Sequence, residues 1–227
     1  MSAETAAGLA PAAVRDATGR RWPAVLLGAG GLVMAVGGSL HPHDAEETLT
    51  DTLVGLLSSP AWGISHLLIL AGVVLVVAGL AGARQERLFP DQVRVWLTVA
   101  IVCWTVAVVE LVPHLLAGSE HRALEAGGAT PMLTTHLTLS VVTEPLLGLS
   151  TAALAVAVAR AARTVPAWLL AVVGVVGGLV FGAAAPLVAV TQSPTFTALF
   201  SADALVSVWL VGTALRLLLP HRAARPA

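Results

Sequence analysis

The chain has 227 residues, 57% of them hydrophobic and 11% charged, with a mean hydropathy of +0.88. These values exclude a soluble domain and indicate a membrane protein whose helices nearly fill the chain. The formal net charge is only −1, and we expect no nucleic-acid partner.

Six apolar runs follow one another along the chain, and each is long enough to cross a bilayer as a helix, which takes about 20 residues. We therefore predict an all-α fold, a polytopic membrane bundle of six transmembrane helices. The first run is interpreted as a retained helix rather than a secretory signal, because it is long and no A-x-A site follows it. The predicted spans are 22–40, 61–82, 93–117, 135–159, 166–190 and 196–219.

The loop after the first run is acidic and leads into a leucine-rich stretch. Asp44 and Glu47 have the spacing of a capping box, and leucines recur at helical spacing over 49–57. This pattern predicts a short amphipathic helix that lies on the outer surface as a lid. A solvated acidic loop is the alternative interpretation.

The arginines are distributed asymmetrically, and the chain contains no lysine. With six spans, only Arg122 falls on the outer side. The positive-inside rule then places both termini in the cytoplasm, in a bacterial inner membrane, and the composition favours an actinobacterial source. We divide the chain into a disordered cytoplasmic N-terminus (1–19), a six-helix transmembrane domain (20–219) and a cytoplasmic tail (220–227). The arginines of the inner side are Arg15, Arg20, Arg21, Arg84, Arg87, Arg94, Arg160, Arg163, Arg216, Arg222 and Arg225.

The fifth run carries a stripe of glycines at four-residue spacing, Gly174, Gly178 and Gly182. Such a stripe lets helix backbones approach closely. Packing within the bundle is the simplest interpretation, and a homo-oligomer that uses this stripe is the alternative. Membrane lipid is expected to surround the rest of the bundle.

Ionisable residues inside the apolar runs are the most informative feature, because the bilayer makes them costly unless they have a function. From the helical rise, Glu110, Glu144 and Asp203 are each expected about 10–12 Å below the outer end of their helix. His66 and His114 are expected at shallower depth, and His136 at the rim. We therefore expect a histidine layer above a carboxylate layer in the outer half, facing the bundle interior or a cavity.

A weak internal repeat also involves histidines. His41 ends the first run and His66 begins the second, while His114 ends the third and His136 begins the fourth. Two helical hairpins would then each place one histidine at either side of an outer turn. Despite this, His41, His43 and His121 are interpreted as ordinary loop histidines, and His221 as a residue of the inner tail.

One functional hypothesis is acid catalysis on a lipophilic substrate. A carboxyl group in an apolar site without a cation stays protonated and can act as a general acid. Glu110 and Asp203 are the candidates for the acid and the stabiliser of a cation, and Glu144 is the reserve. Other expected pocket residues are histidines that orient the carboxyls or hold protons, and deep tryptophans whose π faces could stabilise a cation: His66, His114, His136, Trp104 and Trp209.

In size, number of spans and buried acids, the chain resembles the small integral-membrane terpene cyclases of the meroterpenoid type. These enzymes cyclise prenylated aromatic substrates in fungi and actinobacteria. The resemblance is architectural and covers the whole span region, but no family motif matches, so no catalytic residue is carried over. It implies a lipophilic isoprenoid-like substrate and no cofactor. The aromatic content of 4%, with no tyrosine, departs from the ring-lined pockets usual in cyclases.

Two other functions remain open. Histidine is the commonest metal ligand, so His66 with His114 or His136 could hold a b-type haem, or could bind a divalent metal together with Glu110 or Glu144. No C-x-x-C or H-E-x-x-H signature supports this alternative. A transporter or a non-catalytic membrane partner is the third interpretation, although the apolar inner half of the bundle looks sealed.

Overall fold

The computed structural model describes residues 21–43 and 46–219, so the predictions for the N-terminus, the tail and Asp44 lie outside it. No strand occurs among these residues, and six helical segments are long and apolar enough to cross a membrane, which confirms the all-α bundle and the six spans. The spanning elements are α2 (Trp22–Leu40), α4 (Ala61–Gln85), α5 (Arg94–Ala117), α7 (Pro131–Ala162), α8 (Val165–Thr191), and η3 (Pro194–Ala202) continued by α9 (Asp203–Leu218).

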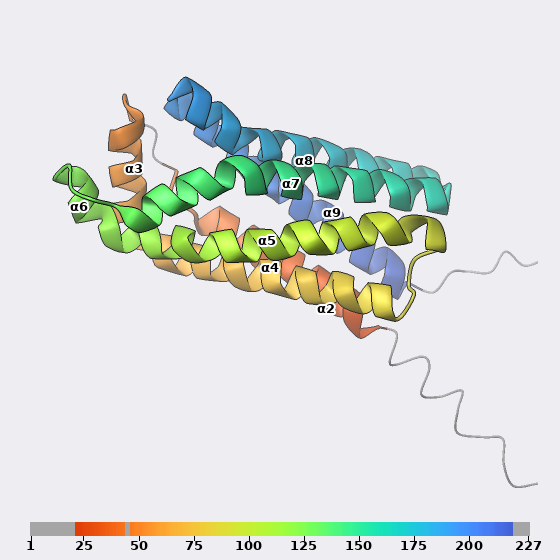
Figure 1. Cartoon of the computed structure of the whole chain (residues 1–227). Helices are drawn as coiled ribbons and strands as arrows, with labels where there is room; N and C mark the ends of the chain where they lie inside the picture. The colour runs from red at the N-terminus through yellow and green to blue at the C-terminus, as the bar shows by residue number, and fades with distance from the viewer. Residues whose placement is uncertain (1–20, 44–45, 220–227) are drawn as a thin grey trace, which may run out of the picture.

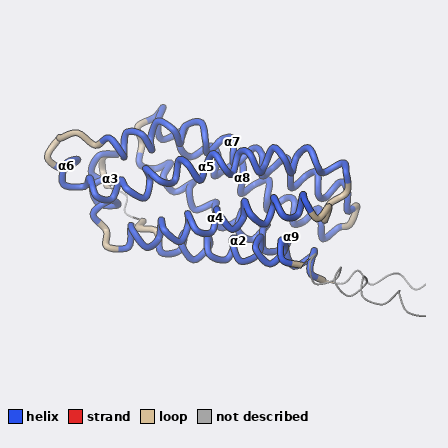
Figure 2. The backbone as a smooth tube through the Cα atoms, turned by 60° about the horizontal axis from the view of Figure 1, so that its bottom comes forward, coloured by secondary structure: helices blue, strands red, loops and turns tan. Residues whose placement is uncertain are grey.

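The spanning helices form a closed ring. Each packs against the next one along the chain, and α9 packs against α2 (Figures 1 and 2). Short connections between consecutive helices favour this antiparallel arrangement. The start of α2 and the end of α9 lie at the same end of the ring (Figure 1). We call this the inner end, and the opposite end, which carries α3 (Leu49–Ser58) and α6 (His121–Glu125), the outer end.

Large apolar side chains cover the outside of the ring. Such a surface would be unstable in water but matches the hydrocarbon of a bilayer. The chain is therefore a multi-pass membrane protein. Examples from five of the helices are Leu32, Val74, Val109, Leu149 and Val172, which are between 46% and 64% exposed.

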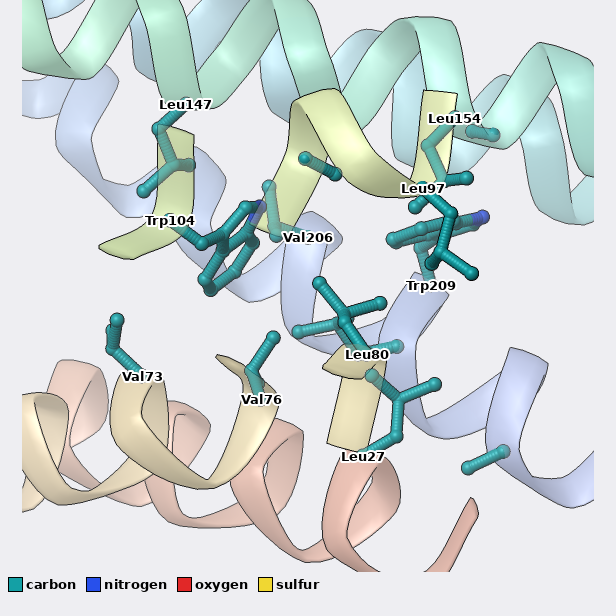
Figure 3. Packing of buried hydrophobic residues seen from close by; sticks show 14 of the residues in the cluster. Leu27, Val73, Val76, Leu80, Leu97, Trp104, Leu147, Leu154, Val206 and Trp209 are labelled. Atoms are coloured by element: carbon teal, nitrogen blue, oxygen red, sulfur yellow. The ribbon is translucent and has the colours of Figure 1, made fainter. Parts of the chain in front are cut away.

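The interior of the ring toward the inner end is a dry apolar core. Trp104 of α5 and Trp209 of α9 are 1% and 2% exposed and lie among leucine and valine side chains of the surrounding helices (Figure 3). The indole Nε1 of Trp104 donates a hydrogen bond to Oγ1 of Thr151 at 3.2 Å. This satisfies the one polar atom of a ring that is otherwise packed on hydrocarbon.

The glycine stripe of α8 packs inside the chain. A Cβ atom at Gly148 of α7 would collide with the backbone carbonyl of Gly178, and Gly182 lies against the same turn of α7. Gly174 lies under the indole of Trp209. The stripe therefore makes contacts within the bundle, as the simpler interpretation predicts.

The predicted outer helix exists as α3, but its cap differs from the expected one. Thr48 is the N-cap, and its side chain accepts a hydrogen bond from the backbone N–H of Asp51 at 3.1 Å. Leu56 and Leu57 pack with Trp62 in a small apolar cluster at the outer end. The lid therefore sits on the bundle through its leucines rather than lying free on the surface.

Two spans differ from their predicted form. α7 begins at Pro131, four residues before the predicted start at 135, because proline is well suited to the first turn of a helix. The last span begins as the 3₁₀ helix η3 and becomes α-helical only at Asp203. Shorter connecting elements are η1 (Asp91–Val93) and η2 (Gly118–Glu120).

Candidate functional site

A cavity of about 680 Å³ occupies the outer part of the ring. Side chains from all six spans and from α3 line it, and most of them are apolar, including Met34, Leu53, Val73, Leu147 and Phe181. This volume lies within the usual range for pockets that bind small organic molecules. The chemistry of the site depends on the polar groups of its wall.

His66 and His114 meet between the neighbouring helices α4 and α5. Their Nε2 atoms lie 3.1 Å apart, although the two residues come from α4 and α5. The Nδ1 atom of His66 donates to the backbone carbonyl of Trp62, at 2.8 Å. The indole of Trp62 stacks on the His66 ring at 3.9 Å between centroids, which holds the imidazole in one orientation.

Glu110 and His136 form the second pair of this wall. Nδ1 of His136 and Oε1 of Glu110 are hydrogen-bonded to each other, between α7 and α5. The same Oε1 atom lies 4.0 Å from Nδ1 of His114. The His114 and His136 rings stack with centroids 3.6 Å apart, so the same oxygen of Glu110 faces both rings.

His41, interpreted from sequence as a loop histidine, belongs to the same wall, and that interpretation is wrong. Its ring lies 4.8 Å from that of His66 between centroids, and its Nδ1 donates to the backbone carbonyl of Pro42 at 2.7 Å. Burial lowers the pKa of His41, and the bond to Pro42 opposes this only in part, so the imidazole is neutral at neutral pH. The repeat of two histidine-bearing hairpins was the signal in the sequence. We call His41, His66, Glu110, His114 and His136 the histidine–glutamate cluster.

Glu144 lies beside this cluster and is less restrained. It lines the same cavity, about two helical turns after His136 on α7. Within the described residues, Oε2 of Glu144 and Oγ1 of Thr143 are buried without a hydrogen-bond partner. Buried polar atoms are normally paired, so these two are candidates for contact with a bound molecule.

Asp203 lines the same cavity from α9 but does not join the cluster. Among the described residues, no hydrogen bond or ion pair connects its carboxyl group to Glu110, Glu144 or a histidine. The carboxyl lies against Gly38 of α2, where a Cβ atom would collide with Oδ2. The structure therefore separates the two acids that were paired from sequence, Glu110 and Asp203, into different parts of one cavity.

Two further expectations need correction. Trp104 and Trp209 do not line the cavity, because they lie in the core below its floor. Trp62 is the tryptophan of the site. His136 is not at the rim but in the second turn of α7, because that helix begins at Pro131. The expected histidine layer above a carboxylate layer is thus one mixed cluster with Glu110 among the histidines.

Two groups of side chains have the spacing of metal ligands. One is His41, His66 and His114, and the other is Glu110, His114 and His136; in each group the ligand atoms lie within 4.8 Å of one another. A haem does not fit between His66 and His114, because the direct contact of their Nε2 atoms leaves no room for a porphyrin. His66 and His136 are separated by His114, which contacts both.

No protein-family model matches the chain, and neither a curated protein nor a solved structure is significantly similar to it. The function therefore has to be inferred from the cavity and its polar wall.

Proposed function

We propose that this protein is a membrane enzyme that acts by general acid catalysis on a lipophilic, isoprenoid-like molecule. The observation that carries the proposal is the cavity, which combines apolar walls with two buried polar atoms that lack partners, Oε2 of Glu144 and Oγ1 of Thr143. A molecule that is mostly hydrocarbon with one polar group would satisfy both features. The architectural resemblance to membrane terpene cyclases points to the same substrate class.

Glu144 is the preferred acid. Glu110 is already engaged by His136, so its proton is shared and its position is fixed. Oε2 of Glu144 has no hydrogen-bond partner among the described residues, so its O–H can donate a proton to a bound molecule, and Glu144 lines the cavity. A general acid has to reach the atom that it protonates, which favours the unengaged carboxyl group.

The other polar residues then take supporting roles. In a cyclisation, Glu144 protonates a carbon–carbon double bond, the resulting cation closes a ring, and a neighbouring carbon loses a proton. Asp203, on a different helix of the cavity wall, would stabilise the positive charge. The histidine–glutamate cluster would accept the released proton and return one to Glu144, since four of its members are linked by contacts of 4.0 Å or less: His66, His114, Glu110 and His136.

The test is turnover of prenylated aromatic substrates by the protein in lipid nanodiscs, with products identified by mass spectrometry. Glu144→Gln is expected to lose about 10²–10⁴-fold in rate, the usual contribution of a general acid, and Asp203→Asn about 10²–10³-fold, as for the loss of one charge-stabilising group. Glu110→Gln is expected to lose activity less completely, because it acts through its neighbours. His121→Ala is the matched control, because His121 belongs to α6, outside the cavity wall.

The acid mechanism would be abandoned if Glu144→Gln and Asp203→Asn both retained wild-type rates. Loss of activity in His121→Ala would also contradict it, because the effect would then not be specific to the cavity. Monodispersity on size-exclusion chromatography establishes that each variant is folded.

The proposed location is a bacterial inner membrane, with both termini in the cytoplasm. The arginines of the described residues gather at the inner end of the ring, with Arg122 at the outer end, as the positive-inside rule requires. Single cysteines at Ser119 and at Gln85, in a Cys103→Ala background, provide the test. An impermeant maleimide added to intact cells should label position 119 and leave position 85 unlabelled; the reverse result would invert the topology.

A further inference from the structure

We propose that His41, His66 and His114 bind a divalent cation of the zinc class through their Nε2 atoms. The three residues come from the end of α2, from α4 and from α5, and their ligand atoms lie within 4.8 Å of one another. Three histidines with a fourth position open to a cavity are a donor set of catalytic zinc sites. The proposal does not rest on the acid mechanism, since Glu144 is not among the ligands.

The tautomers of the three imidazoles support this assignment. In His41 and His66, Nδ1 lies within 2.8 Å of a backbone carbonyl oxygen, of Pro42 and Trp62 respectively, so this nitrogen must carry the proton. In His114, Nδ1 faces the carboxylate oxygen of Glu110 at 4.0 Å. Metal-bound histidines characteristically donate the other ring N–H to a carbonyl or carboxylate. Nε2 is thereby left as a lone-pair donor in His41 and His66, and in His114 when its Nδ1 carries the proton toward Glu110.

The contact between His66 and His114 supports it independently. Their Nε2 atoms lie 3.1 Å apart, and tetrahedral zinc with bonds of about 2.0–2.1 Å places two nitrogen ligands about 3.3 Å apart. When no ion is present, Nε2–H of His114 can donate a hydrogen bond to the unprotonated Nε2 of His66 at this distance. A shared proton is the competing explanation, and metal content distinguishes it from zinc.

Glu110 and His136 have a positioning role in this site. Glu110 faces His114 and is itself hydrogen-bonded to His136, so it can orient His114 without binding the metal. The stacked rings of Trp62 and His136 fix the planes of His66 and His114. All three ligands also line the cavity, so the open position of the ion would face an oxygen atom of the bound molecule.

The first experiment measures metal content. The full chain is purified with an affinity tag that contains no histidine, stripped with a chelator, and incubated with zinc, then with cobalt(II). We expect about one ion per chain and a visible absorption spectrum typical of tetrahedral cobalt(II). His41→Ala, His66→Ala and His114→Ala should each lose the ion. His121→Ala should keep it, as the matched control for removing an imidazole at the outer end.

Glu110→Gln separates a positioning role from a ligand role. This variant should retain the ion with affinity lowered about 10–100-fold, as expected when a partner of a ligand is removed. If a histidine variant does not fold, the wild-type protein loaded with cobalt is titrated with acid instead, and the cobalt spectrum is recorded. The spectrum should be lost on acidification, because protonated histidines release metal.

Absence of binding by the wild-type protein at micromolar zinc or cobalt would overturn the proposal in favour of a shared proton. Retention of a stoichiometric ion by folded His66→Ala would overturn it as well. Neither result depends on turnover, so failure of the metal site and failure of the acid mechanism are distinguished.

Discussion

The inner and outer parts of the ring are built on different principles. Toward the inner end, large apolar side chains such as Leu97 and Trp104 fill the space between the helices (Figure 3). Toward the outer end, the same helices leave a cavity of about 680 Å³ whose wall carries the histidine–glutamate cluster. We therefore expect the inner part to supply most of the stability. The outer part can then hold polar groups that are costly inside a bilayer.

This division explains why the polar residues occur on several helices at one level. A single buried carboxyl group can be satisfied within its own helix or by a neighbour, but here α2, α4, α5 and α7 each contribute to one cluster. The inner core keeps these helices in register. Substitutions in the inner part should change stability, and substitutions in the outer part should change binding and turnover.

The largest effect is expected from Gly178→Leu in the contact between α7 and α8. Gly178 lies against the backbone of Gly148, so a side chain here has to push two helices apart. We expect a loss of stability on the order of 4 kcal/mol or more, or no folded protein at all. Gly63→Leu is the control, because a Cβ atom at Gly63 meets nothing within 4 Å. The measurement is the yield of monodisperse protein.

Trp104→Ala should cause the next largest loss of stability. Removing a buried aromatic side chain from an apolar core destabilises by about 3–5 kcal/mol, measured as a shift of thermal or denaturant unfolding. Thr151→Val removes only the hydrogen bond to the indole and should cost about 1 kcal/mol. Both variants should retain the metal stoichiometry of the wild type. Metal loss from folded Trp104→Ala would show that the two parts of the ring are not independent.

Zinc should stabilise the folded protein through the histidines of the outer part. At a free concentration 100 times the Kd, binding to the folded state contributes about 2.7 kcal/mol. The unfolding temperature of the stripped wild-type protein should therefore rise on addition of zinc and fall again with a chelator. His66→Ala should show no response. An equal rise in His66→Ala would place the stabilising ion elsewhere.

The smallest effect is expected at the lid. Thr48→Ala removes the side chain that caps α3, which costs about 1 kcal/mol and acts locally. Amide exchange over residues 49–58 should become faster, while exchange in α5 and α7 should not change. Ser58→Ala, whose hydroxyl donates to the carbonyl of Gly55 within the last turn of α3, is the control and should leave exchange nearly unaffected.

Much of the fold was predictable because hydropathy and helix length report directly on membrane spans. The six spans and the short helix α3 were recognised, but the start of α7 was placed four residues late. That small displacement put His136 at the rim instead of beside Glu110. An error in a predicted helix boundary therefore shifts the depth at which a site residue is expected.

The candidate site was only partly predictable. The sequence identifies Glu110, Glu144, His66, His114 and His136 as costly residues that need a partner, and the structure places all of them on the cavity wall. The sequence could not indicate which helices are neighbours. Trp104 and Trp209 were therefore expected in the pocket, while His41 and Trp62 were overlooked. The repeat of histidine-bearing hairpins was a signal for His41, whereas the positions of the tryptophans depend on contacts between helices that no local pattern encodes.

The glycine contacts have a mechanical consequence. Gly30 and Gly72 bring the backbones of α2 and α4 together, as Gly148 and Gly178 do for α7 and α8. In each of these two pairs a glycine of one helix lies against the backbone of the other, so we expect the two helices of a pair to move together. α5 contains no glycine, and neither does the segment from η3 into α9 until Gly212. We therefore expect that any opening of the cavity toward the bilayer involves α5 or η3, whose contacts with neighbouring helices are made by side chains.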